Sequence, residues 1–526
     1  MSLLSVTVLL ALVFWLINRI RKIGSRDPRL PPGPPTLPFI GNLHLFPTTH
    51  AHIKFTEWAH VYGDIYSIKI GPQTAVVISS PKMSRECFEI NSATTSSRPE
   101  SQVTDIIFQG NELVLSKYGP HWKNMRRAAH RLLNKDACAS HLPLQHAESS
   151  LLMYNILEDP QNVYNHIRRY AISLALSVTF GIHCPTFNDS MVTELFDLNR
   201  ELDKLVKSGG HPPVEIFPFL GYIPEQLSSW KKTCKNLHAK QHRYFFDLVE
   251  RCLNRMKSGK LNGSFMEYLL ENEAEYDFDR EKTCYLGLSF ITAGADTTAS
   301  YLQFFVLCML ENPEVLVRAQ REIDEVIGPN RTPELEDKER LPYIRAIINE
   351  VHRYRPIAPT SVPHAATADT TVKGYLIPKG SMVIMNTWGI GRDTELFDEP
   401  DKFWPDRYIT SEFGIKPGAD TTGFKDTVFA FGGGRRICPG NHLASNSIAL
   451  NVMNLLWAFD FDLPKDPNTG LPVPLDTNDT TDDMLLTPKP FICDIRPRSI
   501  AKSEQIRKQL ETVQPVLEQF EKSSQK

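Results

Sequence analysis

The sequence predicts a mostly α-helical protein with a minor β-sheet. Beyond Phe55, apolar residues recur mainly at spacings of three and four, which is typical of helices with one buried face. Short stretches typical of strands occur at Ile65–Ile70 and Ala75–Ser79, and again near Thr371–Met385. No internal repeat and no flexible Gly/Ser linker interrupts the middle of the 526 residues, so we expect one large domain.

The charge balance and the cysteines narrow the class of protein. The 58 Lys and Arg residues nearly balance the 61 Asp and Glu residues, and a net charge of −3 argues against general nucleic-acid binding. The nine cysteines are scattered, with no C-x-x-C pair and no Cys/His spacing typical of zinc sites. We therefore expect reduced thiols in a body that faces the cytosol.

The N-terminal segment is predicted to be a transmembrane anchor. Residues 1–18 carry no charged side chain, and at ~1.5 Å per residue they form a short but sufficient helix for a bilayer core of ~30 Å. Arg19, Arg21 and Lys22 follow, and this asymmetry places the remaining chain in the cytosol. The basic start and the small-residue cleavage site of a secretory signal are both missing. The alternative is an ordinary N-terminal core helix.

Two further segments flank the main body. Residues 19–42 combine the basic stop-transfer cluster with RLPPGPPTLPFIGN, whose prolines preclude a helix and favour stiff extended backbone, so we interpret them as a hinge. Residues 499–526 form a C-terminal extension. Its apolar residues from Ser503 to Phe520 recur at helical spacing around Pro515, which predicts a surface helix with no assigned function.

One cysteine has an unusual setting. Cys438 lies between the glycine-rich, doubly basic loop FGGGRRI and an apolar run at helical spacing that starts near Pro439. The dipole and the free N–H groups of a helix N-terminus would stabilise a thiolate and lower the pKa of this cysteine. The glycines allow the loop to fold tightly under something large and flat, and Arg436 offers a cation to a carboxylate. A structural free cysteine is the alternative.

A second unusual stretch, FITAGADTTAS, lies inside a long apolar pattern that predicts one helix. Gly294 alone weakens such a helix by about 1 kcal/mol relative to alanine. If the Thr297 hydroxyl donates to the carbonyl of Ala293, one turn earlier, the helix opens into a groove beside the Asp296 carboxylate. Such a groove can hold a small polar ligand and supply protons. Alternatively, Asp296 or Thr297 caps the start of a second helix.

Three shorter motifs each give only weak evidence of a function. Glu350 and Arg353 share a helix face in NEVHR, and Arg407 follows in the proline-braced turn FWPDRY. Trp122 and Arg126 share a face in WKNMRR. The Glu/Arg pair is equally typical of a helix surface, and the WKNMRR motif of a solvated basic helix.

Together these stretches resemble one family, the cytochrome P450 heme-thiolate proteins. The cysteine loop fits the family signature F-x-x-G-x-R-x-C-x-G without a mismatch, at Phe431, Gly434, Arg436, Cys438 and Gly440. The AGADTT run is similar to its oxygen-activating helix motif, and the E-x-x-R and F-x-P-x-R motifs are similar to its buried charge network. The resemblance covers the chain from the anchor to about Arg498. It is best to the membrane-anchored, reductase-dependent microsomal type found in fungi.

The resemblance implies a cofactor and a set of residues that hold it. It implies a cytochrome P450 fold over a heme-thiolate catalytic domain at residues 43–498, with heme between a long central helix and the cysteine-loop helix. The cofactor would be heme b (iron protoporphyrin IX), with Cys438 as the axial thiolate and metal ligand. The implied cofactor-binding residues are Trp122, Arg126, His364, Phe431, Gly434, Arg436, Cys438 and Gly440.

The resemblance also implies roles for individual side chains. Trp122, Arg126, Arg436 and His364 would bind the heme propionates, although for His364 a satisfied core histidine is the alternative. Thr297 and Asp296 would be the catalytic pair that delivers protons. The E-x-x-R and F-x-P-x-R residues would stabilise the fold and the heme loop.

The implied function is a monooxygenase that inserts one atom of O2 into an apolar small molecule. The substrate classes expected are secondary metabolites, terpenoids, and fatty or aromatic compounds. Electrons would come from NADPH through NADPH–cytochrome P450 reductase, with cytochrome b5 as a further candidate donor, at the endoplasmic reticulum membrane. The alternatives are a heme-thiolate isomerase or dehydratase and a non-catalytic heme-binding sensor. The acid–alcohol pair Asp296-Thr297 argues against both.

The resemblance further assigns five segments to the substrate pocket: Ser101–Leu115, Leu205–Ile223, Phe290–Thr297, Pro356–Pro363 and Met484–Thr487. Their apolar residues are Val103, Ile106, Ile107, Phe108, Phe217, Phe219, Phe290, Ile357, Val362, Leu485 and Leu486. Such residues are as often plain core as pocket lining, so each is an open prediction.

Overall fold

The computed structural model describes residues 7, 12, 14, 15, 23–207, 209–424, 429–466 and 468–523. Apart from four positions, the predicted anchor at residues 1–18 lies outside the described residues, as do Arg19, Arg21 and Lys22. Within the described part of the chain, no helix combines the length and the apolar character that crossing a bilayer requires.

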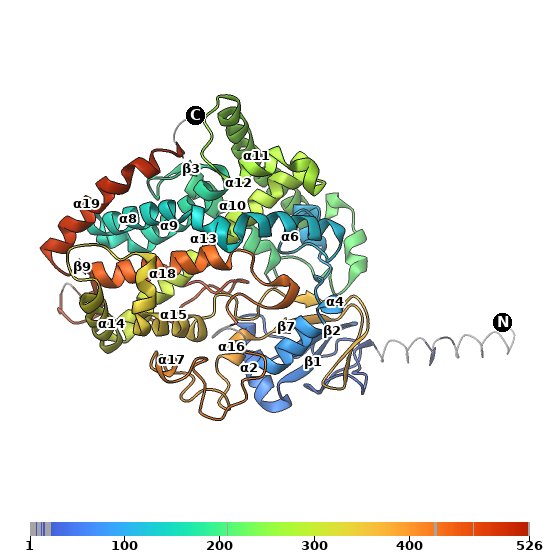
Figure 1. Ribbon diagram of the computed structural model, residues 1–526. Coiled ribbons are helices and arrows are strands. Elements are labelled where there is room, and N and C mark those ends of the chain that lie inside the picture. The colour runs from blue at the N-terminus through green and yellow to red at the C-terminus, as the bar shows by residue number, and fades with distance from the viewer. Residues whose placement is uncertain are drawn as a thin grey trace.

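Helices make up most of the described chain, as the sequence predicts (Figure 1). The first half contains α2 (Ala51–Tyr62), α3 (Pro81–Arg85), α4 (Ser92–Thr95), α5 (Gln102–Phe108), α6 (Pro120–Leu133), α7 (Lys135–Ser140), α8 (Leu142–Glu158), α9 (Val163–Phe180), α10 (Ser190–Val206), α11 (Ser229–Lys257) and α12 (Phe265–Glu271). The second half contains α13 (Arg280–Glu311), α14 (Pro313–Val326), α15 (Pro342–Tyr354), α16 (Thr387–Ile390), α17 (Arg407–Thr410), α18 (Asn441–Ala458) and α19 (Ile500–Leu517).

Short single-turn elements link these helices. The 3-10 turns are η1 (Leu43–Leu45), η3 (Pro160–Asn162), η4 (Pro218–Tyr222), η5 (Glu225–Leu227), η6 (Glu273–Tyr276), η7 (Leu335–Arg340) and η8 (Gly434–Arg436), and η2 (Glu86–Ile90) is a π-turn. Of these, η2 and η8 matter for the site, because they lie against each other beside the cysteine loop.

The principal sheet joins strands that lie about three hundred residues apart in the sequence. Its order is β1 (Ile65–Ile70), β2 (Gln73–Ile78), β7 (Met382–Met385) and β4 (His364–Ala365), with β7 parallel to β2 and the other pairs antiparallel. Figure 1 shows β7 beside β1 and β2. Three small ribbons pair β3 (Ile182–His183) with β10 (Glu521–Lys522), β5 (Thr370–Val372) with β6 (Tyr375–Ile377), and β8 (Phe459–Asp462) with β9 (Asp494–Pro497). The minor-sheet prediction is therefore confirmed.

Helix α13 is the centre of the molecule. It has 32 residues, and Asp279 caps its start by accepting the Lys282 N–H at 2.8 Å. Most of its side chains are buried, since it packs against α9, α11, α15 and α18. A helix that is apolar on all sides belongs in a core. It runs without a break through Phe290–Ser300, so the alternative of a second helix capped at Asp296 or Thr297 is wrong.

The proline-rich segment is fastened to the sheet. Arg26 donates to the carbonyls of Gly33 at 2.9 Å and Pro34 at 2.7 Å, and to the hydroxyl of Ser67 in β1 at 3.0 Å. A Cβ on Gly33 would lie 2.1 Å from the Ser67 carbonyl oxygen, so only glycine allows this close approach. From Arg26 onward, the predicted hinge lies against the body.

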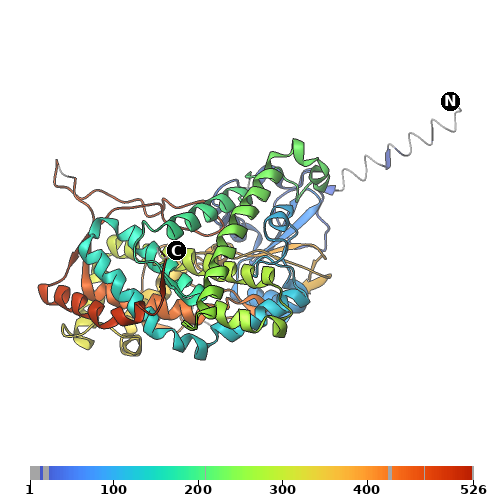
Figure 2. The same cartoon turned by 90° about the horizontal axis from the view of Figure 1, so that it is seen from above.

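The C-terminal extension is helical, as predicted, and it packs on the body. Helix α19 lies along α8 and buries Ile506, Val513 and Leu517. After it, β10 pairs with β3, and Glu521 accepts a hydrogen bond from Arg251 at 2.8 Å. Figures 1 and 2 show α19 at the end of the molecule away from β1 and β2.

Candidate active site

The cysteine loop is held by short-range backbone contacts. The N–H of Cys438 donates to the carbonyl of Phe431 at 2.9 Å, and the N–H of Gly440 donates to the sulfur. Gly434 has φ +62°, and a Cβ there would lie 1.8 Å from the carbonyl oxygen of Phe88 in η2. The loop therefore sits directly on a neighbouring backbone, which explains why a glycine is needed at this position.

The thiol of Cys438 corrects one prediction. Burial raises its pKa, and the Gly440 N–H and the charge of Arg126 offset this only in part. The prediction of a lowered pKa is therefore wrong when only the protein's own groups act on the thiol. Helix α18 begins only at Asn441, and Pro439 lies in the turn before it, so the helix end is not at the sulfur. A metal ion bound to the sulfur would supply the missing positive charge and deprotonate the thiol.

Arg436 is half-buried beside the loop. It donates to the carbonyls of Ser96 at 2.8 Å and Ser116 at 2.6 Å, and its guanidinium lies 4.1 Å from the ring centre of the buried Trp122. Burial and the nearby charge of Arg98 lower its pKa to about 9, which still leaves it a cation at neutral pH.

Sequence analysis missed Arg98, whose only signal is a lone arginine in a loop. It is 6% exposed and donates to the carbonyls of Val114 at 2.7 Å and Val362 at 2.6 Å. Its positive charge acts on both Arg436 and His364, so it belongs to the same group of cations.

His364, in β4, is buried beside these cations. Its Nδ1 lies 2.8 Å from the carbonyl oxygen of Thr95, and its ring packs edge-on against Phe88. Since a carbonyl only accepts, Nδ1 carries the hydrogen and Nε2 is the free acceptor. Burial and the charge of Arg98 lower its pKa to about 3, so the ring is neutral unless an anion lies next to it. The propionate role of His364 stays a prediction.

Arg98, Arg126 and Arg436 form a cation group that carries more positive charge than the protein around it neutralises. Arg126 is half-buried and, within the described residues, its guanidinium has no protein hydrogen-bond or ion-pair partner. The carboxylate that acts on Arg98 and Arg436 is Glu112, whose own pKa is raised by burial. Buried charges need partners. Two guanidinium groups share this one carboxylate and Arg126 is a third nearby, which fits a ligand with two carboxylates, and heme has two propionates.

Helix α13 contains the threonine contact that the sequence predicts. The Thr297 hydroxyl donates to the Ala293 carbonyl at 2.7 Å, which confirms the expected contact. Ala293 is exposed although it lies midway along a buried helix, and Gly432 and Gly433 have open space where a Cβ would lie. Free space beside both elements is what a flat group of the size of heme requires.

The acid of the predicted catalytic pair has partners from distant helices. Asp296 accepts a hydrogen bond from Asn199 Nδ2, in α10, at 2.7 Å. Burial raises the pKa of Asp296, while the positive charge of Arg168, in α9, and the Asn199 contact lower it in part. Neither partner carries a sequence signal, because both lie about a hundred residues or more before Asp296.

The E-x-x-R motif forms the expected buried network. Arg353 donates to both carboxylate oxygens of Glu350, at 2.8 Å and 2.7 Å, and Arg407 adds a contact at 3.2 Å. All three side chains are buried, so the alternative of a surface pair is wrong. On the same helix, the ring of His352 packs against Phe431 with ring centres 5.7 Å apart, which connects α15 to the cysteine loop.

Helix α6 has two distinct faces. Trp122 is buried and Arg126 turns inward with it, whereas Lys123, Arg127 and Arg131 are exposed. Arg127 also donates to the carbonyl of Glu275 at 2.6 Å. The interpretation of WKNMRR as a solvated basic helix therefore applies only to the outer face.

The predicted pocket residues divide into three groups. Val103, Ile107 and Leu486 are core residues, and Phe108, although buried, lines a cavity between α5 and α6. Phe219 is 65% exposed, so its assignment to the pocket is wrong, whereas Phe217 is half-buried and stacks on Phe39, so its assignment stays a prediction. The remaining, half-buried residues are Ile106, Phe290, Ile357, Val362 and Leu485.

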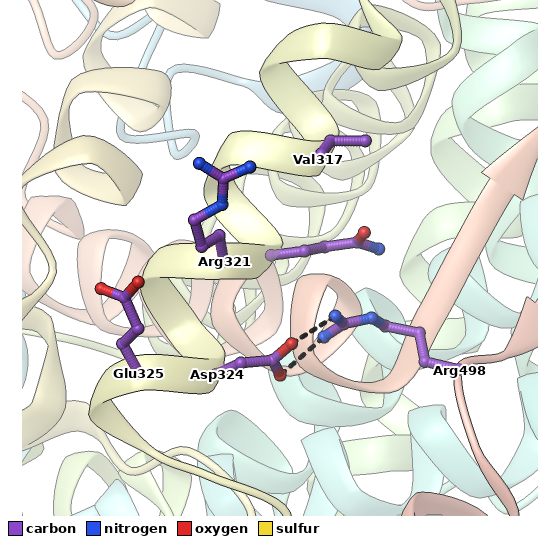
Figure 3. Close-up of a pocket in the computed structure, with 6 residues that line it drawn as sticks. Val317, Arg321, Asp324, Glu325 and Arg498 are labelled. Carbon is purple, nitrogen blue, oxygen red and sulfur yellow. Dashed lines mark hydrogen bonds and ion pairs between the residues drawn. The ribbon is translucent and has the colours of Figure 1, made fainter.

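Two open cavities are lined by described residues. One, of about 420 Å³, lies on α14 beside Arg498, where Asp324 and Arg498 form a two-point ion pair (Figure 3). It contains none of the predicted site residues. The other, of about 460 Å³, lies between α5 and the start of α6 and includes Glu112 and His121.

Residues 31–493 match the family model of Cytochrome P450. The chain belongs to the cytochrome P450 family. This P450 is 41% identical over 506 residues to a cytochrome P450 monooxygenase of Armillaria gallica, covering 96% of each chain. It is 35% identical over 461 residues to one of Aspergillus terreus, covering 87% of this chain and 86% of that one.

Solved structures agree on the fold. A zebrafish cytochrome P450 solved with progesterone superposes with a TM-score of 0.69 at 24% identity, covering 85% of this chain and 99% of that chain. As a member of this family, the P450 is a heme-dependent monooxygenase with cysteine thiolate ligation. The predicted fold class, cofactor and enzyme class are confirmed.

Proposed function

We propose that this P450 inserts one atom of O2 into an apolar small molecule at the cytosolic face of the endoplasmic reticulum, using electrons from NADPH. The observation that carries the proposal is the Cys438 sulfur, which accepts the Gly440 N–H, together with the Thr297 hydroxyl in the middle of α13. A sulfur ligand and a hydroxyl that can pass on protons are the two groups that oxygen activation needs from the protein.

Cys438 is the proposed ligand of the heme iron, and the cation group binds the propionates. When bound, heme supplies the activation of O2. Arg126 and Arg436 each offer N–H donors to a carboxylate. The ring of Trp122 packs against the guanidinium of Arg436. Arg98 is a further proposed propionate partner, because it shares the positive field of Arg436.

Thr297 and Asp296 are proposed to move protons to the reacting oxygen. The Thr297 hydroxyl donates to the Ala293 carbonyl, and Asp296 is the nearest acid along the helix. An isomerase acting on a peroxide and a heme sensor need no such proton supply. This pair therefore favours the monooxygenase over both alternatives.

The proposed substrate is apolar, because the half-buried side chains left from the predicted pocket are hydrocarbon groups. Ile106, Phe290 and Ile357 pack against the core with one side and leave the other side accessible. Each buried methylene of a ligand gains roughly 0.8 kcal/mol. Terpenoid, fatty and aromatic compounds are the classes to test.

The proposed electron donor is NADPH–cytochrome P450 reductase, docked on the outer face of α6, with cytochrome b5 as a further donor. Lys123 and Arg131 are exposed there, and Arg127 lies beside them. The same helix carries the inward-facing Arg126, whose charge acts on Cys438. An acidic partner on this face would therefore approach the thiolate side of the site.

The membrane assignment rests on residues 1–18 and on an exposed apolar surface. Phe219, Tyr222 and Leu227 are 65%, 87% and 80% exposed, and Phe39 stacks on the neighbouring Phe217. Contiguous exposed aromatic and aliphatic groups are typical of surfaces that contact lipid or protein. We place the N-terminus in the lumen and the body in the cytosol.

The test of the activity is oxygen incorporation. The chain, expressed in a eukaryotic host that contains a reductase, is supplied with NADPH, isotopically heavy O2 and a panel of apolar compounds. The expected result is substrate-dependent NADPH consumption and a product with one heavy oxygen atom. NADPH-independent conversion, or heme binding without turnover on any compound, would favour the alternatives.

The test of the topology is glycosylation of Asn188. This residue is exposed and begins the acceptor sequence Asn-Asp-Ser, so only its compartment decides whether it is modified. It should stay unmodified in cells, and a glycan at Asn188 would place the body in the lumen.

A further inference from the structure

Asn199 links α10 to the acid of the catalytic pair. Its Nδ2 donates to Asp296 Oδ2 at 2.7 Å, and Asn199 is only 8% exposed. The contact is therefore partly shielded from bulk water. Hydrogen bonds to charged groups are stronger than those between neutral groups.

The other end of this amide lacks a partner. Asn199 Oδ1 is buried and, within the described residues, has no hydrogen bond. An unpaired buried carbonyl destabilises the fold, so it needs an explanation. A half-turn of the amide would bring Oδ1 to Asp296, where it could accept a hydrogen bond from the protonated acid. Asn199 can thus bond to Asp296 in either protonation state.

The charges around Asp296 oppose each other. The groups that act on it or face it are Arg168 and Tyr164 from α9, Asn199 and Asp203 from α10, and Asp483 beside Asp203. Burial favours the neutral acid, whereas Arg168 and the Asn199 N–H favour the carboxylate. Loss of the Asn199 contact should therefore move Asp296 toward the protonated state.

We infer that Asn199 is a positioning residue. It keeps a hydrogen bond to Asp296 in both the ionised and the protonated state, and so lets Asp296 relay protons toward Thr297. The inference rests on the proposed function and deepens it. In each relay step, a proton from solvent neutralises the Asp296 carboxylate, leaves again toward the reacting oxygen and restores the carboxylate. No electrons are exchanged in this step.

The direct test measures the protonation of Asp296 in the heme-loaded full chain. The infrared band of its protonated carboxyl group, assigned by its loss in Asp296→Asn, is titrated against pH. Asn199→Leu removes the donor and should raise the apparent pKa of Asp296. Asn199→Asp keeps the size of the side chain and should raise it further, because two carboxylates then share the site.

Two control variants make the measurement specific. Gln241→Met, in α11, removes another buried amide whose oxygen also lacks a partner, and it should leave the Asp296 titration unchanged. Asp203→Asn removes a neighbouring negative charge and should shift the titration the opposite way, to lower pH. A general loss of packing would not leave the Asp296 titration unchanged in Gln241→Met while shifting it in opposite directions in the Asn199 and Asp203 variants.

A second readout is the ratio of product formed to NADPH oxidised. Loss of a general acid costs about 10²–10⁴-fold, so loss of its positioning alone should lower this ratio by roughly tenfold in Asn199→Leu. Heme content should stay at the parent level. An unchanged Asp296 titration in both Asn199 variants would overturn this inference. A parent protein that forms no oxygenated product would instead contradict the proposed function.

Discussion

The cysteine-loop side of the site and the α13 side are built over very different distances along the chain. On the first side, the hydrogen bonds from Cys438 to Phe431 and from Gly440 to the sulfur close within ten residues. On the second, Asp296 depends on Asn199 and on the charge of Arg168, which come from other helices. The bonds that hold the ligand sulfur are local, whereas the contacts that hold the acid are made between helices.

This difference separates two kinds of function. A loop closed by its own backbone holds its ligand atom in one position, as a permanent metal ligand requires. A carboxylate held by one amide and one distant charge can change its protonation, as a relay requires. Changes on the cysteine-loop side should therefore remove heme, and changes on the α13 side should alter only how electrons and protons are used.

The largest effect is expected from Glu350→Gln, which breaks the network that supports the cysteine-loop side. Arg353 and Arg407 would keep their buried charges without a full partner, which costs about 3–5 kcal/mol. The free energy of unfolding and the yield of heme protein should both fall steeply. Glu339→Gln, which breaks an exposed pair with Arg345, should cost less than about 1 kcal/mol. Equal effects of the two variants would refute the assignment.

The next effect concerns the cation group. Arg436→Leu removes a donor for a propionate, and a hydrogen bond to a charged group contributes about 1.5–3 kcal/mol, or roughly 10- to 150-fold in heme affinity. Transfer of heme to an acceptor apoprotein should be faster by that factor. Arg435→Leu, at the neighbouring exposed position, is the control and should release heme at the parent rate. Parent-like heme release from Arg436→Leu would exclude the propionate role.

A smaller effect, without loss of heme, is expected from Thr297→Ala on the α13 side. NADPH consumption should continue, but more oxygen should leave as hydrogen peroxide and less should appear in product, because the hydroxyl no longer steers protons. Thr298→Ala, about 100° around the helix and buried, is the control with a weaker effect. If Thr297→Ala stays as well coupled as the parent, the residue is only a helix-bending threonine.

The smallest effect concerns the outer face of α6. The double variant Lys123→Glu, Arg127→Glu should be reduced more slowly by the reductase, and its rate should depend less on salt, because surface charges mainly set encounter rates. Lys508→Glu, an exposed site on α19, should retain the parent salt dependence. Identical salt dependence in the double variant and the parent would exclude this docking face.

The comparison of the two sides also explains what the sequence could predict. The cysteine loop, the Thr297 contact and the Glu350 network were predictable, because each depends on residues within one turn or one signature. Asn199 and Arg98 were missed, since their roles arise only from tertiary packing. Phe219 was misassigned because an apolar residue in a loop can face the pocket or the solvent.

The pKa of Cys438 was predicted with the wrong sign for a similar reason. The sequence indicated a nearby helix start, but it could not give the burial of the sulfur, which outweighs the Gly440 N–H. The strands and the long helix were predicted well, because their patterns of apolar residues are regular over many positions.

The central claim is that Cys438 binds the heme iron as a thiolate. It is tested most directly by the absorption spectrum of the reduced carbon monoxide complex, recorded for the parent and for Cys438→Ser at equal protein concentration. The parent should show the strongly red-shifted Soret band that thiolate ligation produces, and Cys438→Ser should lose that band. Cys438→Ser protein with full heme content and an unchanged red-shifted band would contradict the account.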